Sequence, residues 1–514
     1  MQMTYPSAAE INAWEALGNP AWSWKDLEPY YRRSETLIAP SNDVSALLGT
    51  SHYDPSNYGD GGPIKVSFYK SCSDIQRAWL EAFEVRGHRM HGDPLSGEAI
   101  GGFTNPASVD PDSMSRSYSA NAYYSPSSAR PNLFVLTEAY VQKIHLSPSQ
   151  LSEGKFAANG VSFVQDSREY EVKARREVIL SAGAIQSPQI LELSGIGSRC
   201  ILKSYNIDTF VENPNVGENL QDHALVGICY EVADSTASLD ALRDPRLLNE
   251  ALGAYTTTKT GPFAGGVEAS AFVPLTPSLS GTDEINLPQE LLSDEAQGNI
   301  SFHEQHLLLR KTLSNPNEAA SQLMLLPFQV HGASAHDQQE LFRPTSAGSY
   351  LTLTAQISRP FSRGHVHIQS ANPSDHPAID PRYLSHPMDI EIMCRQLQNL
   401  EVLTNTEPLA SQLLQGGRTI PANFPRTPSL DTFKTLIEDT LTTQYHPIGT
   451  CAMLPLEKGG VVDSTLKVYG TSNLRIVDAS VFPLHIRGNI QSTVYAVAEY
   501  GADIIRRDWE SAMR

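Results

Sequence analysis

The sequence predicts a composite α/β fold, and three observations lead to this prediction. The chain has 514 residues, which is too long for one simple core and corresponds to roughly two to four folding units. Two segments, Arg176–Ser198 and Asn473–Trp509, each read as a buried strand followed by a small-residue turn and a helix. Units of this kind build α/β proteins and bring backbone close to a ligand at the carboxyl ends of their strands.

In the first segment, the apolar run of residues 178–180 (VIL) is suited to a short buried strand. Ser187 and Pro188 follow, and they supply a helix N-cap and a proline for the first helical position. Gly195 marks the end of the helix. We therefore expect a strand over 178–180 and a helix between Ser187 and Gly195.

In the second segment, residues 474–477 (LRIV) predict another strand, which ends at Asp478. Ser492 and Thr493 can cap the helix that follows, and its apolar residues recur at helical spacing at positions 494, 497, 501, 504 and 505. Asn489 then lies just before a helix N-terminus, where backbone N–H groups and the helix dipole favour negative charge. A site that generates an anion fits this position.

Composition and charge describe a globular protein and exclude some classes of partner. Hydrophobic residues make up 40% of the chain and charged residues 18%, so sizeable cores can form. The formal net charge of -19 argues against a nucleic-acid-binding surface, which needs clustered Lys and Arg. No apolar run approaches the roughly 18 residues that span a bilayer. The first residues also lack the pattern of a signal peptide. Because we expect the start of the chain to be truncated, both a secreted and a cytoplasmic location stay open.

The cysteines give no sign of a metal or redox site. None of the five forms a C-x-x-C pair, which excludes the common zinc and redox spacings and any dense disulfide framework. We therefore predict no metal centre. The cysteines are Cys72, Cys200, Cys229, Cys394 and Cys451.

The stretch YHPIGTCAM, Tyr445 to Met453, contains the strongest candidate for acid-base chemistry. His446 precedes a proline, which fixes its own φ and biases the residue before it toward extended geometry. The imidazole should therefore point in a well-defined direction. Taken alone, the motif also fits a histidine that is only hydrogen-bonded within the core.

Several segments together resemble the glucose-methanol-choline (GMC) oxidoreductases, flavoenzymes that oxidise alcohols. The resemblance covers nearly the whole chain, and its motifs occur in family order. They are NAWEALGNPAWSWKDLEPYYRRSE (12–35), RPNLFVLTEAYVQKI (130–144), GAIQSPQILELSGIG (183–197), NPNVGENLQDH (213–223), SRPFSRGHVHIQSANPSDHPAIDPRYLSHPMD (358–389), YHPIGTCAM (445–453) and the closing segment with VDASVFP (477–483).

The resemblance implies the roles of two catalytic residues. His446 matches the family's base, which takes the hydroxyl proton of an alcohol while hydride leaves the carbon for the flavin. Asn489 matches the second active-site position, where an amide can orient the substrate hydroxyl without titrating. His485, four residues before Asn489, is expected to have no chemical role, and His223 in the LQDH segment is expected to be structural.

The resemblance also implies FAD as the cofactor and a set of residues near it. Val141 is expected to contact the adenine end through its backbone. Asp478, Ala479, Asn489 and Ile490 are expected near the isoalloxazine. Apolar strand and turn residues would occupy such places in any α/β core, so for these positions the structural interpretation stays open beside the functional one.

The implied architecture is an incomplete Rossmann-like FAD-binding domain joined to a substrate-binding domain built on an antiparallel sheet. We expect residues 1–224 to form the N-terminal FAD-binding region and residues 225–356 a substrate-binding or lid region. Residues 357–508 would form the C-terminal region, with the catalytic and flavin-contacting end from about 440.

The chain departs from the family pattern at its start. Family members begin with a βαβ unit that carries G-x-G-x-x-G and cradles a pyrophosphate at a helix N-terminus. No G-x-G-x-x-G occurs in these 514 residues, since Gly195-Ile196-Gly197 lacks the third glycine. We expect either that the given start lies inside a longer protein or that the chain is a fragment with weakened flavin binding.

Three functions remain open from the sequence. The first is FAD-dependent oxidation of a small primary or secondary alcohol, by an oxidase or a dehydrogenase. The second is a non-redox lyase or cyclase that keeps flavin as a structural element and uses His446 for acid-base work. The third is a non-catalytic remnant. The substrate stays unnamed because specificity depends on the loops of the second domain, with an aromatic or secondary-metabolite alcohol slightly favoured over a sugar.

Overall fold

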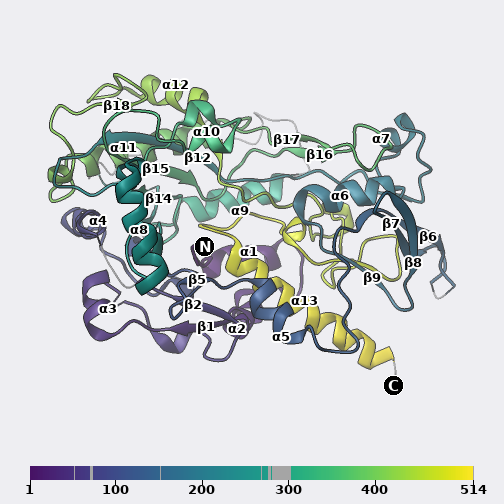
Figure 1. The fold of residues 1–514 in the computed structure, drawn as a ribbon. Coiled ribbons are helices and arrows are strands. Elements are labelled where there is room, and N and C mark those ends of the chain that lie inside the picture. Colours follow the sequence, from purple (N-terminus) through teal and green to yellow (C-terminus); the bar gives the residue numbers. More distant parts are fainter. Residues whose placement is uncertain are drawn as a thin grey trace.

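The computed structural model describes residues 1–50, 52–69, 73–150, 152–267, 269–275, 279 and 302–512. Figure 1 shows a large sheet at the upper left, a smaller sheet at the right, and the last helix running to the lower right. The helices are α1 (Ala8–Ala16), α2 (Trp24–Ser34), α3 (Asn42–Leu48), α4 (Asp74–Val85), α5 (Ser125–Ser127), α6 (Gly183–Leu193), α7 (Arg199–Ser204), α8 (Pro245–Thr258), α9 (His303–Leu313), α10 (Gln338–Leu341), α11 (Pro387–Thr404), α12 (Leu430–Thr440) and α13 (Gln491–Ala512).

The large sheet has seven strands, and all of their pairings are antiparallel. Its order is β18-β12-β15-β14-β13-β3, with β19 also paired to β12. The strands are β3 (Gly101–Thr104), β12 (Ala224–Glu231), β13 (Ala269–Val273), β14 (Ser321–Leu326), β15 (Tyr350–Ile357), β18 (Thr419–Ile420) and β19 (Thr442–Thr443). This is the antiparallel sheet that the resemblance implies.

The two faces of this sheet differ in polarity. Along β15, Leu351, Leu353, Ala355 and Ile357 alternate with Thr352, Thr354 and Gln356, and all seven are buried. The apolar set belongs to the main core, together with apolar residues of α11, which packs on this strand. The polar set lies on the other face, where Gln356 donates a hydrogen bond to His223. The sheet therefore presents buried polar groups toward the functional site.

Smaller sheets complete the fold. The parallel pair β9 (Val178–Leu180) and β20 (Leu474–Ile476) joins the two segments that predict the α/β character. The other strands are β1 (Glu35–Ile38), β2 (Ile64–Ser67), β4 (Val109–Asp110), β5 (Ser115–Arg116), β6 (Tyr140–Pro148), β7 (Phe156–Gln165), β8 (Arg168–Lys173), β10 (Ile196–Gly197), β11 (Val211–Glu212), β16 (His365–His367) and β17 (Ala378–Asp380). The predicted α/β fold class is confirmed.

The strand predicted over 178–180 is confirmed as β9, but the predicted start of the following helix is wrong. Helix α6 begins at Gly183, so Pro188 lies inside it. Two distant contacts make this possible. The N–H of Gly183 donates to Asp478 Oδ2 at 2.9 Å, and the carbonyl of Ala184, which a proline four residues later cannot bond, accepts from Thr450 Oγ1 at 2.6 Å. The helix ends as expected, with Gly195 at φ +82 after the C-cap Ser194.

The closing helix follows the prediction except at its cap. Strand β20 ends at Ile476, and α13 begins at Gln491, so Asn489 lies just before the helix as expected. The proposed caps are wrong, because Ser492 and Thr493 are already helical. Their side chains bond to other segments, Ser492 to the Thr4 carbonyl and Thr493 to the Tyr31 hydroxyl. These contacts anchor α13 on the N-terminal segment and on α2.

Two further expectations stay predictions. The domain boundaries at 224/225 and 356/357 are untested, and the large sheet takes strands from all three predicted regions. The incomplete start also stays a prediction; in the part of the chain that the structure describes, β9 pairs only with β20, and Ile179 on β9 is 45% exposed. None of the described helices is long and apolar enough to cross a membrane.

Candidate active site

Two loops that are close in the fold but separate in the sequence frame the site. Residues 449–453 run beside residues 479–481, with hydrogen bonds from Gly449 N to Ala479 O at 3.3 Å, from Cys451 N to Ser480 O at 2.9 Å and from Met453 N to Val481 O at 2.8 Å. This backbone pairing joins the YHPIGTCAM segment to the VDASVFP segment. It thereby brings His446 to the same region as Asp478.

His446 is held rigidly and is 8% exposed. Its backbone N–H donates to Asp222 Oδ1 at 2.9 Å. The preceding residue, Tyr445, has φ +62, an unfavourable conformation for a bulky side chain that the surrounding contacts maintain. Burial and the neighbouring His485 lower the pKa of His446 from 6.5 to about 3. The imidazole is therefore neutral and able to accept a proton across the physiological range.

Asn489 lies beside His446. Its Nδ2 is 3.2 Å from His446 Nε2. Its backbone is clamped by Thr4, whose hydroxyl accepts from Asn489 N and donates to Asn489 O. The side-chain Oδ1 of Asn489 is buried and has no hydrogen-bond partner among the described residues. An orphaned buried acceptor is unfavourable, so this oxygen suits a donor on a bound molecule.

The structure brings two more histidines to His446. His223 Nδ1 is 2.9 Å from His446 Nδ1, and the rings of His223 and His485 are stacked, with centroids 3.6 Å apart and planes at 30°. His485 Nε2 donates to the backbone carbonyl of His446 at 3.0 Å. Burial lowers the pKa of His485 to about 4 and that of His223 well below 6.5. Three neutral imidazoles therefore pack together at the site.

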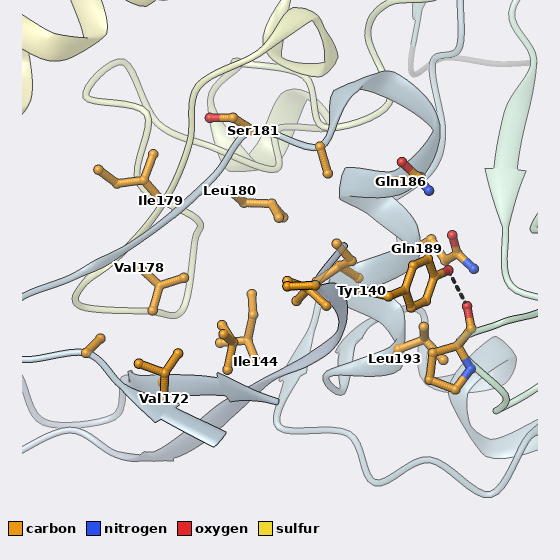
Figure 2. Close-up of a pocket in the computed structure, with 18 of the residues that line it drawn as sticks. Tyr140, Ile144, Val172, Val178, Ile179, Leu180, Ser181, Gln186, Gln189 and Leu193 are labelled. Carbon is orange, nitrogen blue, oxygen red and sulfur yellow. Dashed lines mark hydrogen bonds between the residues drawn. The ribbon is translucent and has the colours of Figure 1, made fainter. Parts of the chain in front are cut away.

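The predicted adenine contact, Val141 on β6, lines a cavity of about 550 Å³ (Figure 2). Leu180, Ser181 and Ala182, at the carboxyl end of β9, line the same cavity. Its other walls combine the apolar side chains of Ile144, Val178, Ile190 and Leu193 with the amides of Gln186 and Gln189. Apolar walls with a few amide groups suit a flat heteroaromatic ring, so these residues fit the adenine end of FAD.

The residues predicted near the isoalloxazine lie just after the carboxyl end of β20 and just before α13. The carboxylate of Asp478 is fully used inside the protein, because Oδ2 accepts from Gly183 N and Ser187 Oγ and Oδ1 accepts from Ser480 N and Oγ. Any contact of Asp478 with the cofactor must therefore come from its backbone. Ala479 and Ile490 are both half-buried.

Sequence reasoning missed the residues that support the two candidate catalytic residues, His446 and Asn489. Thr4 clamps Asn489, Asp222 holds the backbone of His446, and Gln356 contacts His223. Asp222 and His223 stand in the LQDH segment that carries the resemblance, so that segment could have pointed to them. Nothing in the local sequence around Thr4 or Gln356 indicates these contacts, which join residues far apart in the chain.

Comparisons with known proteins identify the family of this chain. Family models described as GMC oxidoreductase match residues 1–225 and 360–498. Dehydrogenase citC from Monascus ruber is 34% identical over 523 aligned residues, which cover 99% of this chain and 82% of the relative.

Two solved structures have the same fold. An FAD-dependent oxidoreductase from Chaetomium thermophilum superposes with a TM-score of 0.85 at 27% identity, covering 99% of this chain and 85% of the other. A fungal aryl-alcohol oxidase gives a TM-score of 0.85 at 26% identity, with coverages of 99% and 84%. The chain therefore belongs to the GMC oxidoreductase family and is an oxidoreductase whose cofactor is FAD.

Proposed function

We propose that this protein oxidises a primary or secondary alcohol to the carbonyl compound, with His446 as the base and Asn489 as the orienting group. The observation that supports this proposal is the pairing of a buried neutral imidazole with a half-buried amide, 3.2 Å apart, directly before the N-terminus of α13. When bound, FAD supplies the acceptor for the hydride that leaves the alcohol carbon.

His446 Nε2 accepts the hydroxyl proton of the substrate. The low pKa of this imidazole makes it a weak base, so it can take the proton only as the C–H bond breaks and the hydroxyl becomes acidic. Burial assists the step in another way, because water is kept from competing for the lone pair. The product is the carbonyl compound, and the proton stays on Nε2.

Asn489 positions the hydroxyl for this transfer. Its NH₂ group can donate to the substrate oxygen, and its orphaned Oδ1 can accept from a neighbouring donor. Because the Thr4 hydroxyl fixes the backbone of Asn489, the amide is oriented before the substrate binds. The N-terminus of α13 adds a positive potential where negative charge develops.

For the cofactor, we propose Val141 at the adenine end and the backbones of Asp478, Ala479 and Ile490, with the side chain of Asn489, at the isoalloxazine end. The cavity at Val141 and the closed hydrogen bonding of the Asp478 carboxylate support this division. The aryl-alcohol oxidase among the similar structures supports oxidation of an alcohol, and the dehydrogenase among the relatives supports oxidation in general. An aromatic or secondary-metabolite alcohol is the first substrate class to test.

Anaerobic mixing of the flavin-loaded protein with a panel of alcohols tests the proposal. We expect loss of the oxidised flavin absorbance near 450 nm, and a slower loss when the alcohol carries deuterium on the reacting carbon. Conversion of a substrate without any change in flavin absorbance would instead indicate a non-redox lyase or cyclase. Binding of flavin with no reduction by any alcohol would contradict the proposal.

A further inference from the structure

We propose that His223 is a positioning residue that fixes the tautomer of His446 and keeps the Nε2 lone pair of His446 directed toward Asn489. The inference deepens the proposed function, because it rests on His446 acting as the base. It assigns a task to a histidine that the sequence marks only as structural. The inference follows from the hydrogen-bond partners of the His223 and His446 rings.

The hydrogen of the neutral His223 ring is on Nε2. Its Nε2 lies 2.9 Å from the carbonyl oxygen of Ser358 and 2.9 Å from that of Ile486. Carbonyl oxygens only accept hydrogen bonds. If Nε2 carried no hydrogen, its lone pair would face the lone pairs of these two carbonyl oxygens, which is repulsive. Nε2 must therefore carry the hydrogen.

The opposite ring nitrogen of His223, Nδ1, faces His446. In the neutral ring, protonation at Nε2 leaves Nδ1 as an acceptor. Two groups approach it, Gln356 Nε2 at 2.7 Å and His446 Nδ1 at 2.9 Å. The ring stays neutral because it is fully buried and stacks on His485, and because its hydrogen-bond partners among the described residues include no carboxylate. Burial accordingly lowers the pKa of His223 well below 6.5.

The acceptor on His223 in turn fixes the tautomer of His446. Because His223 Nδ1 accepts, His446 Nδ1 must donate and therefore carries its hydrogen. His446 Nε2 is then the unprotonated nitrogen, and it is the one that lies 3.2 Å from Asn489 Nδ2. After proton uptake at Nε2, the Nδ1–H of His446 still faces a lone pair and not a second N–H. The pair thus serves both the neutral and the protonated base.

His485 completes the arrangement without competing for this role. Its Nε2 donates to the carbonyl of His446 at 3.0 Å, and its Nδ1 accepts from Ile486 N at 3.0 Å. Both of its ring nitrogens are therefore bonded to backbone. Its flat face packs on His223 and fixes the plane of that ring. Of the two neighbouring rings, only that of His223 bonds to the imidazole of His446.

The wild-type protein allows a direct test by NMR with ¹⁵N-labelled histidine, on the flavin-loaded form at neutral pH. We expect the Nε2 of His446 to show the chemical shift of an unprotonated nitrogen and its Nδ1 that of an N–H. His223 should show the reverse, with its hydrogen on Nε2. Signals are assigned by comparison with the His223→Asn and His446→Ala variants. A hydrogen on Nε2 of neutral His446 would overturn the inference.

Two variants of equal shape test the functional consequence. His223→Asn places a side-chain oxygen near the position of Nδ1 and keeps an acceptor for His446. His223→Leu has the same shape but no acceptor. We expect the rate of flavin reduction to fall roughly 10- to 100-fold in His223→Leu, less than for loss of the base itself. The KM should change little, and His223→Asn should stay within about threefold of the wild type.

Equal rates in the two variants, with flavin content retained, would show that His223 only fills space and would refute the inference. If His223→Leu does not fold, the wild-type NMR result still decides the question. Failure of the proposed function is distinguishable, because a wild-type protein that no alcohol reduces would still report its His446 tautomer by NMR.

Discussion

The buried histidines at the site should make folding stability depend on pH in a way that one substitution isolates. His485 is 1% exposed, and burial lowers its pKa from 6.5 to about 4. As the pH falls, the unfolded chain therefore binds a proton at this residue before the folded protein does. The stabilising contribution of a neutral His485 is complete above pH 6.5 and is lost progressively as the pH falls toward 4.

The size of the effect follows from the two pKa values. At pH 5 the unfolded state gains about 2 kcal/mol from protonation of this one residue, and the folded state gains almost nothing. His485→Gln removes the titrating group and keeps an N–H that can donate to the carbonyl of His446. The free energy of unfolding of the wild type minus that of His485→Gln should thus fall by about 2 kcal/mol from pH 7 to pH 5.

Urea unfolding followed by tryptophan fluorescence measures this difference, since Trp14, Trp22 and Trp79 are fully buried. If the wild-type free energy of unfolding minus that of His485→Gln stays constant or rises between pH 7 and pH 5, His485 is not neutral in the fold.

Three further predictions concern the support of the site. Asn489→Ala should slow flavin reduction roughly 10- to 10³-fold with flavin content retained, because the amide orients and does not exchange a proton; a larger loss than that for the base would reverse the two roles. Gly488→Ala should lower the free energy of unfolding by about 1–3 kcal/mol, since Gly488 has φ +68 and an added Cβ would overlap the Thr4 hydroxyl; a neutral result in urea unfolding would contradict this. Arg359→Met should cost roughly 3–5 kcal/mol, because the buried carboxylate of Glu10 loses its ion-pair partner; unchanged stability would mean that Glu10 is protonated in the fold.

Local sequence signals predicted the strands of the α/β core but not the start of α6. The run Val178–Leu180 forms β9 as expected, because a short apolar run is a local property. The Ser187-Pro188 pair is an equally local signal, yet the helix begins earlier, at Gly183. Asp478, which is distant in sequence, caps this earlier start, and Thr450 satisfies the carbonyl that Pro188 leaves free. Tertiary contacts of this kind are invisible in the sequence around Pro188.

The candidate site divides in the same way. His446 and Asn489 stand out from their motifs, and the structure places their side chains 3.2 Å apart. The residues that support them come from other parts of the chain: Thr4, from the first residues, holds Asn489, and Gln356, from the large sheet, reaches His446 only through His223. A single sequence shows which residue types are present at these positions, but not that the fold brings them together.

The measurement that tests the central claim most directly is the rate of anaerobic flavin reduction by an alcohol substrate in wild type and in His446→Ala. We predict a fall of roughly 10²–10⁴-fold in His446→Ala, the usual contribution of a positioned general base, with flavin content nearly unchanged. Reduction at the wild-type rate in a flavin-loaded His446→Ala protein would remove His446 from the mechanism and contradict the account.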